Sequence, residues 1–206
     1  MLHPVPTLKE TPSQTAGPYV HIGMTPNWAD IRGVYETDPG ATMVSADTPG
    51  TRIILSGRII DGAGVPVSDA VVEIWQADGN GSYGRPVGSS AEARPAFTGW
   101  GRQPANGEGE FRFETIKPGP VPGPDGRPMA PHVAVWIVAR GINIGLQTRI
   151  YFADEEAANA RDFVLNRIPD PKRRATLIAR KEEGDVPQYR LDIHLQGDSE
   201  TVFFDM

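Results

Sequence analysis

The sequence predicts a mainly β protein, built as an antiparallel β-sandwich with one or two short helices. Three observations predict it: short apolar runs rich in β-branched residues, segments in which polar and apolar residues alternate, and clusters of glycine and proline between them. The 206 residues include 23 glycines and 20 prolines. Because these residues gather between the apolar runs, they indicate turns rather than disorder.

The expected strands begin after residue 50. Apolar, β-branched or alternating character marks segments 52–60, 71–75, 111–116, 132–139, 148–152 and 188–196. Turns are expected at Asp61–Gly64 and Asp78–Gly81. Phe111–Ile116 alternates with a period of two, which is the pattern of a half-buried strand.

Two short segments are predicted to be helical. Asp154–Val164 begins with acidic residues, is rich in alanine and lacks glycine and proline. A second helix is expected over Lys172–Arg180. The stretch Lys117–Pro131 holds six prolines and is predicted to be a loop.

The chain is expected to form a single domain with a long N-terminal arm. Residues 1–50 hold seven prolines and little regular pattern apart from the apolar stretch Tyr19–Ile22. Residues 51–206 carry the strands and a C-terminal extension. Because the arm has so little core material, it must lie on its own domain or on a neighbouring chain.

Composition excludes several classes of function. The formal net charge is −6, so the chain has no electrostatic reason to bind nucleic acid or an anionic membrane. The basic run Lys172–Arg174 is interpreted as a solvated face. Without cysteine, disulfides and thiolate metal sites are excluded, and a cytoplasmic location is expected. No segment has the ~20 apolar residues of a membrane span, and the first ten residues do not resemble a secretory signal.

The strongest motif is the run LSGRIIDGAGVPVSDAVVEIWQADGNGSY, which covers Leu55–Tyr83. A strand, a turn and a second strand of this kind also occur in non-catalytic transthyretin-like modules. Three further segments follow it: Thr115–Pro122, Met129–Ile142 and Thr148–Glu155. In this order and spacing, the segments resemble the intradiol ring-cleaving dioxygenases over most of Thr11–Tyr151. The resemblance implies a transthyretin-like core.

The resemblance also implies a place for a metal, which this chain fills only in part. In the family a ferric ion is held by two tyrosines and two histidines, whose hard anionic and imidazole donors suit Fe³⁺. Tyr83 matches the first tyrosine and His132 the first histidine. The second tyrosine is replaced by Val121 and the second histidine by Ala134, and neither donates a lone pair. Tyr83 and His132 are therefore interpreted as vestiges, hydrogen-bonded inside a filled pocket.

The two ends of the chain resemble the non-iron subunit of two-chain members of the family. The matching segments are Glu10–Gly23 and Tyr189–Met206. The resemblance implies a homologous iron-binding β chain that carries Fe³⁺, a higher α–β oligomer, and an active site at the α–β boundary. It further implies O₂-dependent intradiol cleavage of protocatechuate to 3-carboxy-cis,cis-muconate.

The resemblance implies that five residues line the substrate pocket of the partner's site. They are Thr15, Gly17, Pro18, Tyr19 and Arg140. A guanidinium suits the carboxylate of such a substrate. The simpler alternatives are an interface salt bridge for Arg140 and a plain turn at Gly17–Pro18. Three tryptophans, at positions 75, 100 and 136, are expected in the core or in an interface.

Two other functions compete with an enzyme subunit. One is a non-catalytic transthyretin-like binding module, which would have no use for an arm that reaches outward. The other is an enzyme that acts alone with a metal held by Tyr83, His132 and an acidic residue. Metal analysis of the single chain would separate this last possibility from the first.

Overall fold

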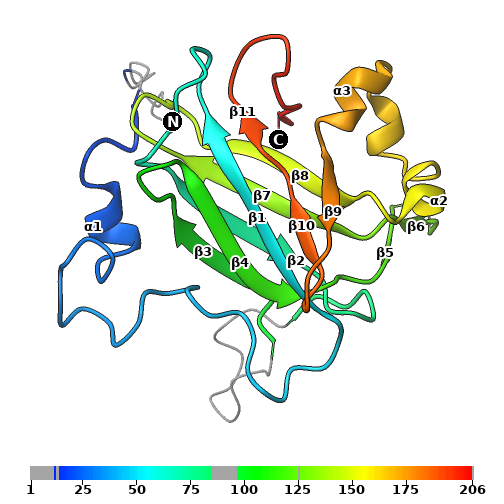
Figure 1. Cartoon of the computed structure of the whole chain (residues 1–206), viewed down its shortest axis with the longest axis horizontal. Coiled ribbons are helices and arrows are strands. Elements are labelled where there is room, and N and C mark those ends of the chain that lie inside the picture. The colour runs from blue at the N-terminus through cyan, green and yellow to red at the C-terminus, as the bar shows by residue number, and fades with distance from the viewer. Residues whose placement is uncertain (1–11, 13, 85–96, 125, 206) are drawn as a thin grey trace, which may run out of the picture.

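A computed structural model describes residues 12, 14–84, 97–124 and 126–205 (Figure 1). The long strands are β1 Arg52–Ile60, β2 Val71–Gln76, β3 Trp100–Pro104, β4 Glu110–Ile116, β7 His132–Val138, β8 Leu146–Phe152 and β9 Ile178–Glu182. The short strands are β5 Val121–Pro122, β6 Pro128–Met129, β10 Gln188–Arg190 and β11 Ile193–His194. The helices are α1 Val20–Met24, α2 Glu156–Asn159, α3 Pro171–Ala175 and the 3₁₀ turn η1 Leu165–Arg167.

All the strands except β5 and β6 form one continuous hydrogen-bonded path, in the order β11-β1-β10-β9-β8-β7-β2-β3, with β4 paired to β1. Strands β5 and β6 pair only with each other. The mainly β class is therefore confirmed. Two separate antiparallel sheets are not, because β9 pairs with both β8 and β10 and so joins the two layers. Three pairings are parallel rather than antiparallel: β1 with β10, β1 with β11, and β8 with β9.

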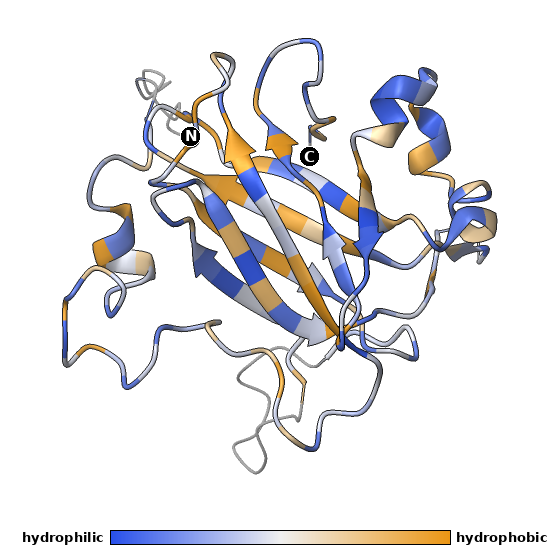
Figure 2. Ribbon diagram, in the orientation of Figure 1, coloured by the Kyte–Doolittle hydropathy of each residue, from blue (hydrophilic) through white to orange (hydrophobic). Residues whose placement is uncertain are grey.

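The sheet curls around one main core. On β1, alternate residues such as Ile53, Leu55 and Ile59 are buried, and the same alternation is visible along the strands in Figure 2. They pack in one cluster with Val133 and Val135 of β7, from the other layer. Strand periodicity thus places the apolar side chains between the layers.

The helix predicted over Asp154–Val164 is wrong for most of its length. Helix α2 covers four residues, Glu156–Asn159, and is followed by the separate turn η1. The reason is tertiary: the carboxylate of Asp162 is held in the interior by hydrogen bonds from Tyr151 and Ala130. There it also accepts the backbone N–H groups of Val164 (3.0 Å) and Leu165 (2.8 Å). These bonds turn the chain at a point where the alanine-rich pattern predicted that the helix would continue.

The second helix and the last strand also differ from the prediction. Helix α3 spans Pro171–Ala175, and the chain from Ile178 joins the sheet as β9 instead of remaining helical. The segment 188–196 is two strands, β10 and β11, separated at Leu191–Asp192. The carboxylate of Asp192 accepts the backbone N–H of Arg58 at 3.1 Å, which replaces a strand contact there. The predicted loop 117–131 contains the small hairpin of β5 and β6.

The segment before β1 and the C-terminal segment both pack on the chain's own sheet. Met43 is buried in the core, and the carbonyl of Gly40 accepts the backbone N–H of Arg102 on β3 at 2.9 Å. Helix α1, which the sequence did not predict, lies to one side of the sheet (Figure 1). Near the C-terminus, the backbone N–H of Phe204 donates to the carbonyl of Gln147 on β8 at 2.8 Å.

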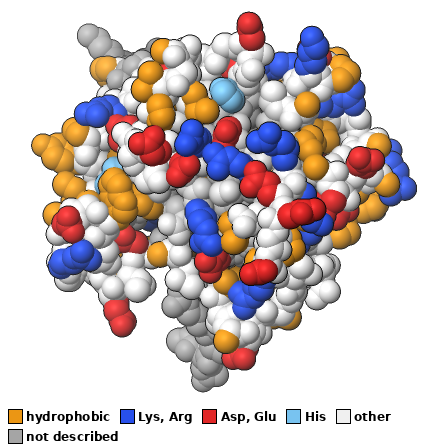
Figure 3. All heavy atoms as spheres, in the orientation of Figure 1, with side chains coloured by type: hydrophobic (Ala, Val, Ile, Leu, Met, Phe, Trp, Pro, Cys, Tyr) orange, Lys and Arg blue, Asp and Glu red, His pale blue; other side chains and the backbone are white. Residues whose placement is uncertain are grey.

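The two outer faces of the sheet differ in character. The face of β1, β4 and β10 carries ion pairs between Arg58 and Glu110 and between Arg112 and Glu114, and its mixed charges are visible in Figure 3. The opposite outer face, on β2, β3 and β7, carries the three tryptophans. Trp75 and Trp100 are cross-strand partners and therefore share this face. Trp136 is the partner of Glu73, which lies two residues before Trp75 on β2 and so points to the same side. Trp75 is 41% exposed. We call this second surface the tryptophan face.

No helix among the described residues is long and apolar enough to cross a membrane.

Candidate functional site

The start of β7 gathers the positions that resemble the family's metal ligands. His132 is the cross-strand partner of Tyr151, and Ala134 is the partner of Arg149. Since partners share a face of the sheet, these four side chains lie on the same outer face. Val121 is buried in β5 and pairs with Met129.

Tyr83 reaches this region from the turn after β2. Asp78 builds that turn, because its carboxylate accepts the backbone N–H groups of Asn80 and Ser82, both at 2.9 Å. Before the turn, the amide of Gln76 donates to the carbonyl of Ile116 at 2.8 Å and thereby ties the end of β2 to the end of β4. Tyr83 itself is 47% exposed.

Burial keeps the two remaining donors neutral. Burial lowers the pKa of His132, and Arg149 lowers it further, against the hydrogen bond with Ala130 that raises it. Nδ1 of His132 lies 2.7 Å from the carbonyl oxygen of Ala130. Burial also raises the pKa of Tyr83, although the positive charge of Arg149 opposes that shift. At neutral pH Tyr83 is therefore a phenol and His132 a neutral imidazole.

Asp162 organises the wall of this region, and sequence reasoning missed it. Its side chain is fully buried, and it accepts hydrogen bonds from the hydroxyl of Tyr151 (3.1 Å) and the backbone N–H of Ala130 (2.9 Å). A buried carboxylate requires such partners. No periodicity in the sequence could have separated Asp162 from the acidic residues of an exposed helix.

The far end of β7 carries part of the predicted substrate set. The hydroxyl of Thr15 accepts the backbone N–H of Gly141 at 2.8 Å and donates to the carbonyl of Ala139 at 3.3 Å. These two bonds bracket Arg140. The structure therefore brings together Thr15 and Arg140, which are 125 positions apart by their residue numbers.

Arg140 has a partner within the chain. Its Nε lies 3.1 Å from Oδ2 of Asp69, and its side chain is 64% exposed. The carbonyl of Asp69 lies 3.2 Å from Nε2 of His21, at the start of α1. Burial lowers the pKa of His21, against the raising influence of Asp69. Asp69 and His21 were not singled out from the sequence.

The rest of the set forms the bend that leads into α1. Gly17 has a φ of 68°, a conformation that glycine adopts without strain. Pro18 and Tyr19 follow in the turn, and the carbonyl of Tyr19 accepts the backbone N–H of Ile22 at 3.1 Å. The ring of Tyr19 is 75% exposed. A plain turn and a surface for another molecule are both compatible with this geometry.

The two sets lie at opposite ends of β7. Its seven residues run from His132 to Val138, with Arg140 just beyond. At about 3.3 Å per residue, His132 and Arg140 are separated by roughly 26 Å. In Figure 1 the α1 side and the side of β5 and β6 are correspondingly far apart. Thr15 and Arg140 therefore cannot act on a ligand at Tyr83 and His132 of the same chain.

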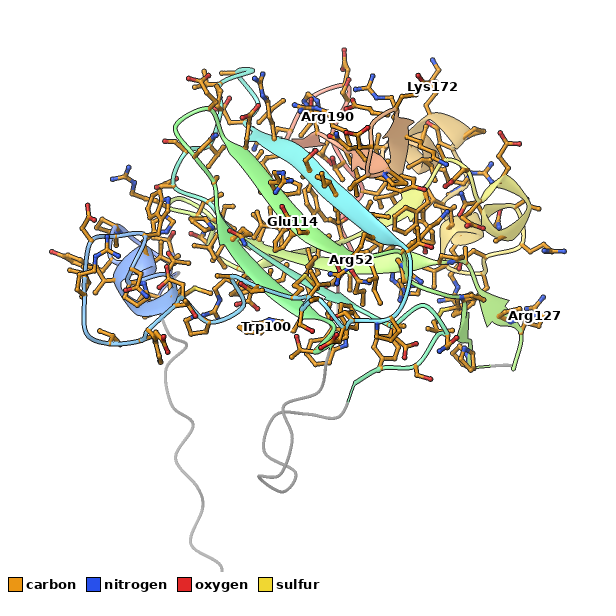
Figure 4. All side chains as sticks on the ribbon, turned by 60° about the horizontal axis from the view of Figure 1, so that its bottom comes forward. Arg52, Trp100, Glu114, Arg127, Lys172 and Arg190 are labelled. Carbon is orange, nitrogen blue, oxygen red and sulfur yellow. The ribbon has the colours of Figure 1, made fainter. Side chains whose placement is uncertain are left out.

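A cavity of about 1160 Å³ lies beside the hairpin of β5 and β6, and the sequence did not predict it. Its lining includes Lys117, Arg127, Met129, Asp162 and Phe163. Figure 4 shows Arg127 at this end of the molecule, away from α1. Lys117 forms ion pairs with Asp154 (2.9 Å) and Glu155 (2.7 Å).

Comparison with known proteins identifies the family. A family model described as Dioxygenase matches residues 25–197. The chain is 46% identical to the protocatechuate 3,4-dioxygenase alpha chain of Pseudomonas putida, over 98% of this chain and 99% of that one. The chain belongs to the intradiol dioxygenase family. It is also 35% identical to the protocatechuate 3,4-dioxygenase beta chain of Burkholderia cepacia, over 72% of this chain and 66% of that one.

A solved structure shows the same intradiol dioxygenase fold. The 3-chlorocatechol 1,2-dioxygenase of Rhodococcus opacus superposes with a TM-score of 0.60 at 22% identity, over 80% of this chain and 67% of that one. At this identity the likeness concerns the fold alone.

Intradiol dioxygenases are non-haem iron enzymes, and the residues of this chain do not fit that metal. Two of the four matching positions, Val121 and Ala134, have no donor atom. In addition, the guanidinium of Arg149 brings a positive charge to the face of the sheet that carries His132 and Ala134. Among the residues that the structure describes, no group of three or more His, Cys, Asp or Glu side chains is placed to hold a metal ion.

Proposed function

We propose that this chain is the non-iron α subunit of a protocatechuate 3,4-dioxygenase. It completes the substrate pocket of a homologous β chain that carries Fe³⁺. The reaction is O₂-dependent cleavage of protocatechuate between its two hydroxyl-bearing carbons, which gives 3-carboxy-cis,cis-muconate. A cysteine-free chain that acts on a small aromatic acid suits the cytoplasm, which we propose as its location.

One observation carries the proposal: the predicted substrate residues are built on the opposite end of β7 from the vestigial metal positions. Thr15 and Arg140 lie roughly 26 Å from His132. A substrate bound by these two residues therefore could not contact a metal at the vestigial positions of the same chain. The two residues can assist an iron site only if that site belongs to another chain. Similarity to both an alpha and a beta chain supports a partner of the same fold.

The residues at the arm end have the chemistry that such a substrate needs. Arg140 offers a fixed positive charge and directed N–H donors to a benzoate carboxylate. The turn Gly17–Tyr19 offers the exposed phenol ring of Tyr19 and, at Gly17, a backbone without a side chain. Reactivity of the catechol ring toward O₂ would be supplied by the ferric iron of the partner. This chain would bind and orient the substrate and exclude water.

The partner surface is argued from exposed apolar residues. The arm exposes Tyr19, Ile22, Trp28 and Tyr35, and the loop after β7 exposes Ile144, which is 81% exposed. Together with the tryptophan face, these residues form an apolar surface of the kind that marks protein interfaces. The charged face of β1 and β4 has paired ions instead and suits solvent.

Co-expression with a homologous iron-binding chain tests the proposal. We expect the two chains to purify as one complex that takes up O₂ with protocatechuate, while each chain alone is inactive. Chains that purify separately, or O₂ uptake by the partner that this chain does not change, would show that it is not a subunit of the enzyme.

A further inference from the structure

The face of the sheet that corresponds to the family's metal pocket carries an arginine. Arg149 lies on β8 directly across from Ala134, the position of the second histidine. Its neighbour on the same face, Tyr151, lies across from His132. Arg149 thus stands beside the two positions where a His-x-His pair would project from β7.

The contacts of Arg149 place its guanidinium among the remaining donors. Its Nη1 lies 3.8 Å from Sδ of Met129, which is the pairing partner of Val121. Its positive charge also acts on Tyr83, His132 and Tyr151. The rings of His132 and Tyr151 lie 5.8 Å apart. Residues at or beside all four metal positions therefore surround one guanidinium.

The charge of Arg149 decides whether a metal cation can enter this pocket. Asp162 is the acid that acts on the same two side chains, His132 and Tyr151, and all described hydrogen bonds of its carboxylate go to Tyr151 and to backbone N–H groups. An arginine side chain does not lose its proton in a protein, so its charge is permanent. A metal cation that entered beside it would meet direct repulsion in a partly buried site.

We infer that Arg149 takes the place of the metal in this chain and closes the pocket to metal ions. The loss of two donors weakens an iron site, whereas the guanidinium fills the space and supplies the positive charge beside the phenol and imidazole that remain. In an assembly with an iron-bearing partner, this keeps the metal on one kind of subunit. Arg149 is therefore a specificity-determining residue for metal, not a catalytic residue.

A metal titration of the purified full chain tests this inference. Ala134→His creates the His-x-His pair with His132, and Cu²⁺ is the probe. We compare Ala134→His alone, Ala134→His with Arg149→Gln, and Ala134→His with Arg149→Lys, which retains the charge. The Gln variant should bind Cu²⁺ with a Kd on the order of tenfold to hundredfold lower than the other two, since removal of a cation relieves repulsion.

Two results would overturn the inference. Equal Cu²⁺ affinity in all three variants would show that the charge of Arg149 does not exclude metal. Absence of binding in all three, with each variant folded by circular dichroism, would show that something other than Arg149 keeps metal out. Arg149→Met in the same background is a second neutral variant, in case the Gln variant does not fold. No partner chain enters the titration, so its outcome is independent of the proposed α–β enzyme.

Discussion

Nε of Arg140 lies 3.1 Å from Oδ2 of Asp69, at the same end of the sheet where the hydroxyl of Thr15 holds the backbone on either side of Arg140. The guanidinium is thereby restrained by a carboxylate while 64% of the side chain stays exposed. An exposed pair of this kind contributes little to stability. Its consequence is geometric: it fixes the direction of a charge that faces outward from the chain.

Arg140→Ala should impair substrate binding in the assembled complex. Loss of a charge-assisted contact costs about 1.5–3 kcal/mol, which is roughly a tenfold to hundredfold loss in kcat/KM for protocatechuate. Catechol, which has no carboxylate, should be much less affected. Steady-state oxygen uptake with both substrates measures this, and Arg112→Ala on the charged face is the matched control. Equal losses for the two substrates would instead assign Arg140 to the interface.

Asp69→Asn should release Arg140 without removing its charge. Because the pair is exposed and worth at most about 1 kcal/mol, we expect KM for protocatechuate to rise by no more than about fivefold, with kcat nearly unchanged. Asp69→Glu, which keeps the carboxylate, should recover most of the lost affinity. A fall in kcat that Glu does not restore would mean that Asp69 serves the fold rather than the orientation of Arg140.

The tryptophan face should be required for assembly. Trp75→Glu places a charge on a surface that we assign to the partner, and a central aromatic residue in an interface is commonly worth 2 kcal/mol or more. The affinity of the two chains should therefore fall by about thirtyfold or more. Sedimentation or size-exclusion of the mixed chains measures it. Arg112→Glu, on the opposite face, should leave assembly intact, and similar behaviour of the two variants would exclude the tryptophan face as the contact.

Much of the sheet could be predicted from sequence because its strands are local patterns. Arg52–Ile60 alternates along its whole length, and the predicted limits agree with β1. The failures are residues whose conformation is decided by distant partners. Ile178 leaves the predicted helix because it pairs with Tyr151 of β8, and Asp162 ends a helical pattern because it bonds Tyr151 and Ala130.

The candidate site divides in the same way. The family resemblance predicted roles for Thr15 and Arg140. It did not predict how far they lie from the vestigial metal positions, because that distance depends on the direction of β7. Asp69 and Arg149 lie inside the matching segments Leu55–Tyr83 and Thr148–Glu155, but the resemblance gave neither of them a role. They matter because of what lies across the sheet or at its edge, and pairings of this kind are fixed only when the chain folds.

Asp154 should stabilise the fold in a pH-dependent manner. Burial would raise its pKa, but hydrogen bonds from Lys117, Tyr189 and Lys181 outweigh burial and lower the pKa from 3.8 to about 2. The stabilisation is therefore complete above about pH 4 and is lost as the pH falls toward 2. Asp154→Asn should cost about 2 kcal/mol at pH 7, and less below pH 4. Urea unfolding from pH 3 to 8 checks this, with the exposed Asp185→Asn as control. A cost that does not change with pH would contradict the role assigned to the charge.

The central claim is that iron belongs to the partner and not to this chain, and iron content tests it most directly. In the purified complex we expect one iron per pair of chains, and the same content and tyrosinate-to-iron absorption when Tyr83 is changed to phenylalanine. This chain produced by itself should contain negligible iron. A Tyr83→Phe complex that loses iron or its colour, or stoichiometric tightly bound iron in the isolated chain, would contradict the account.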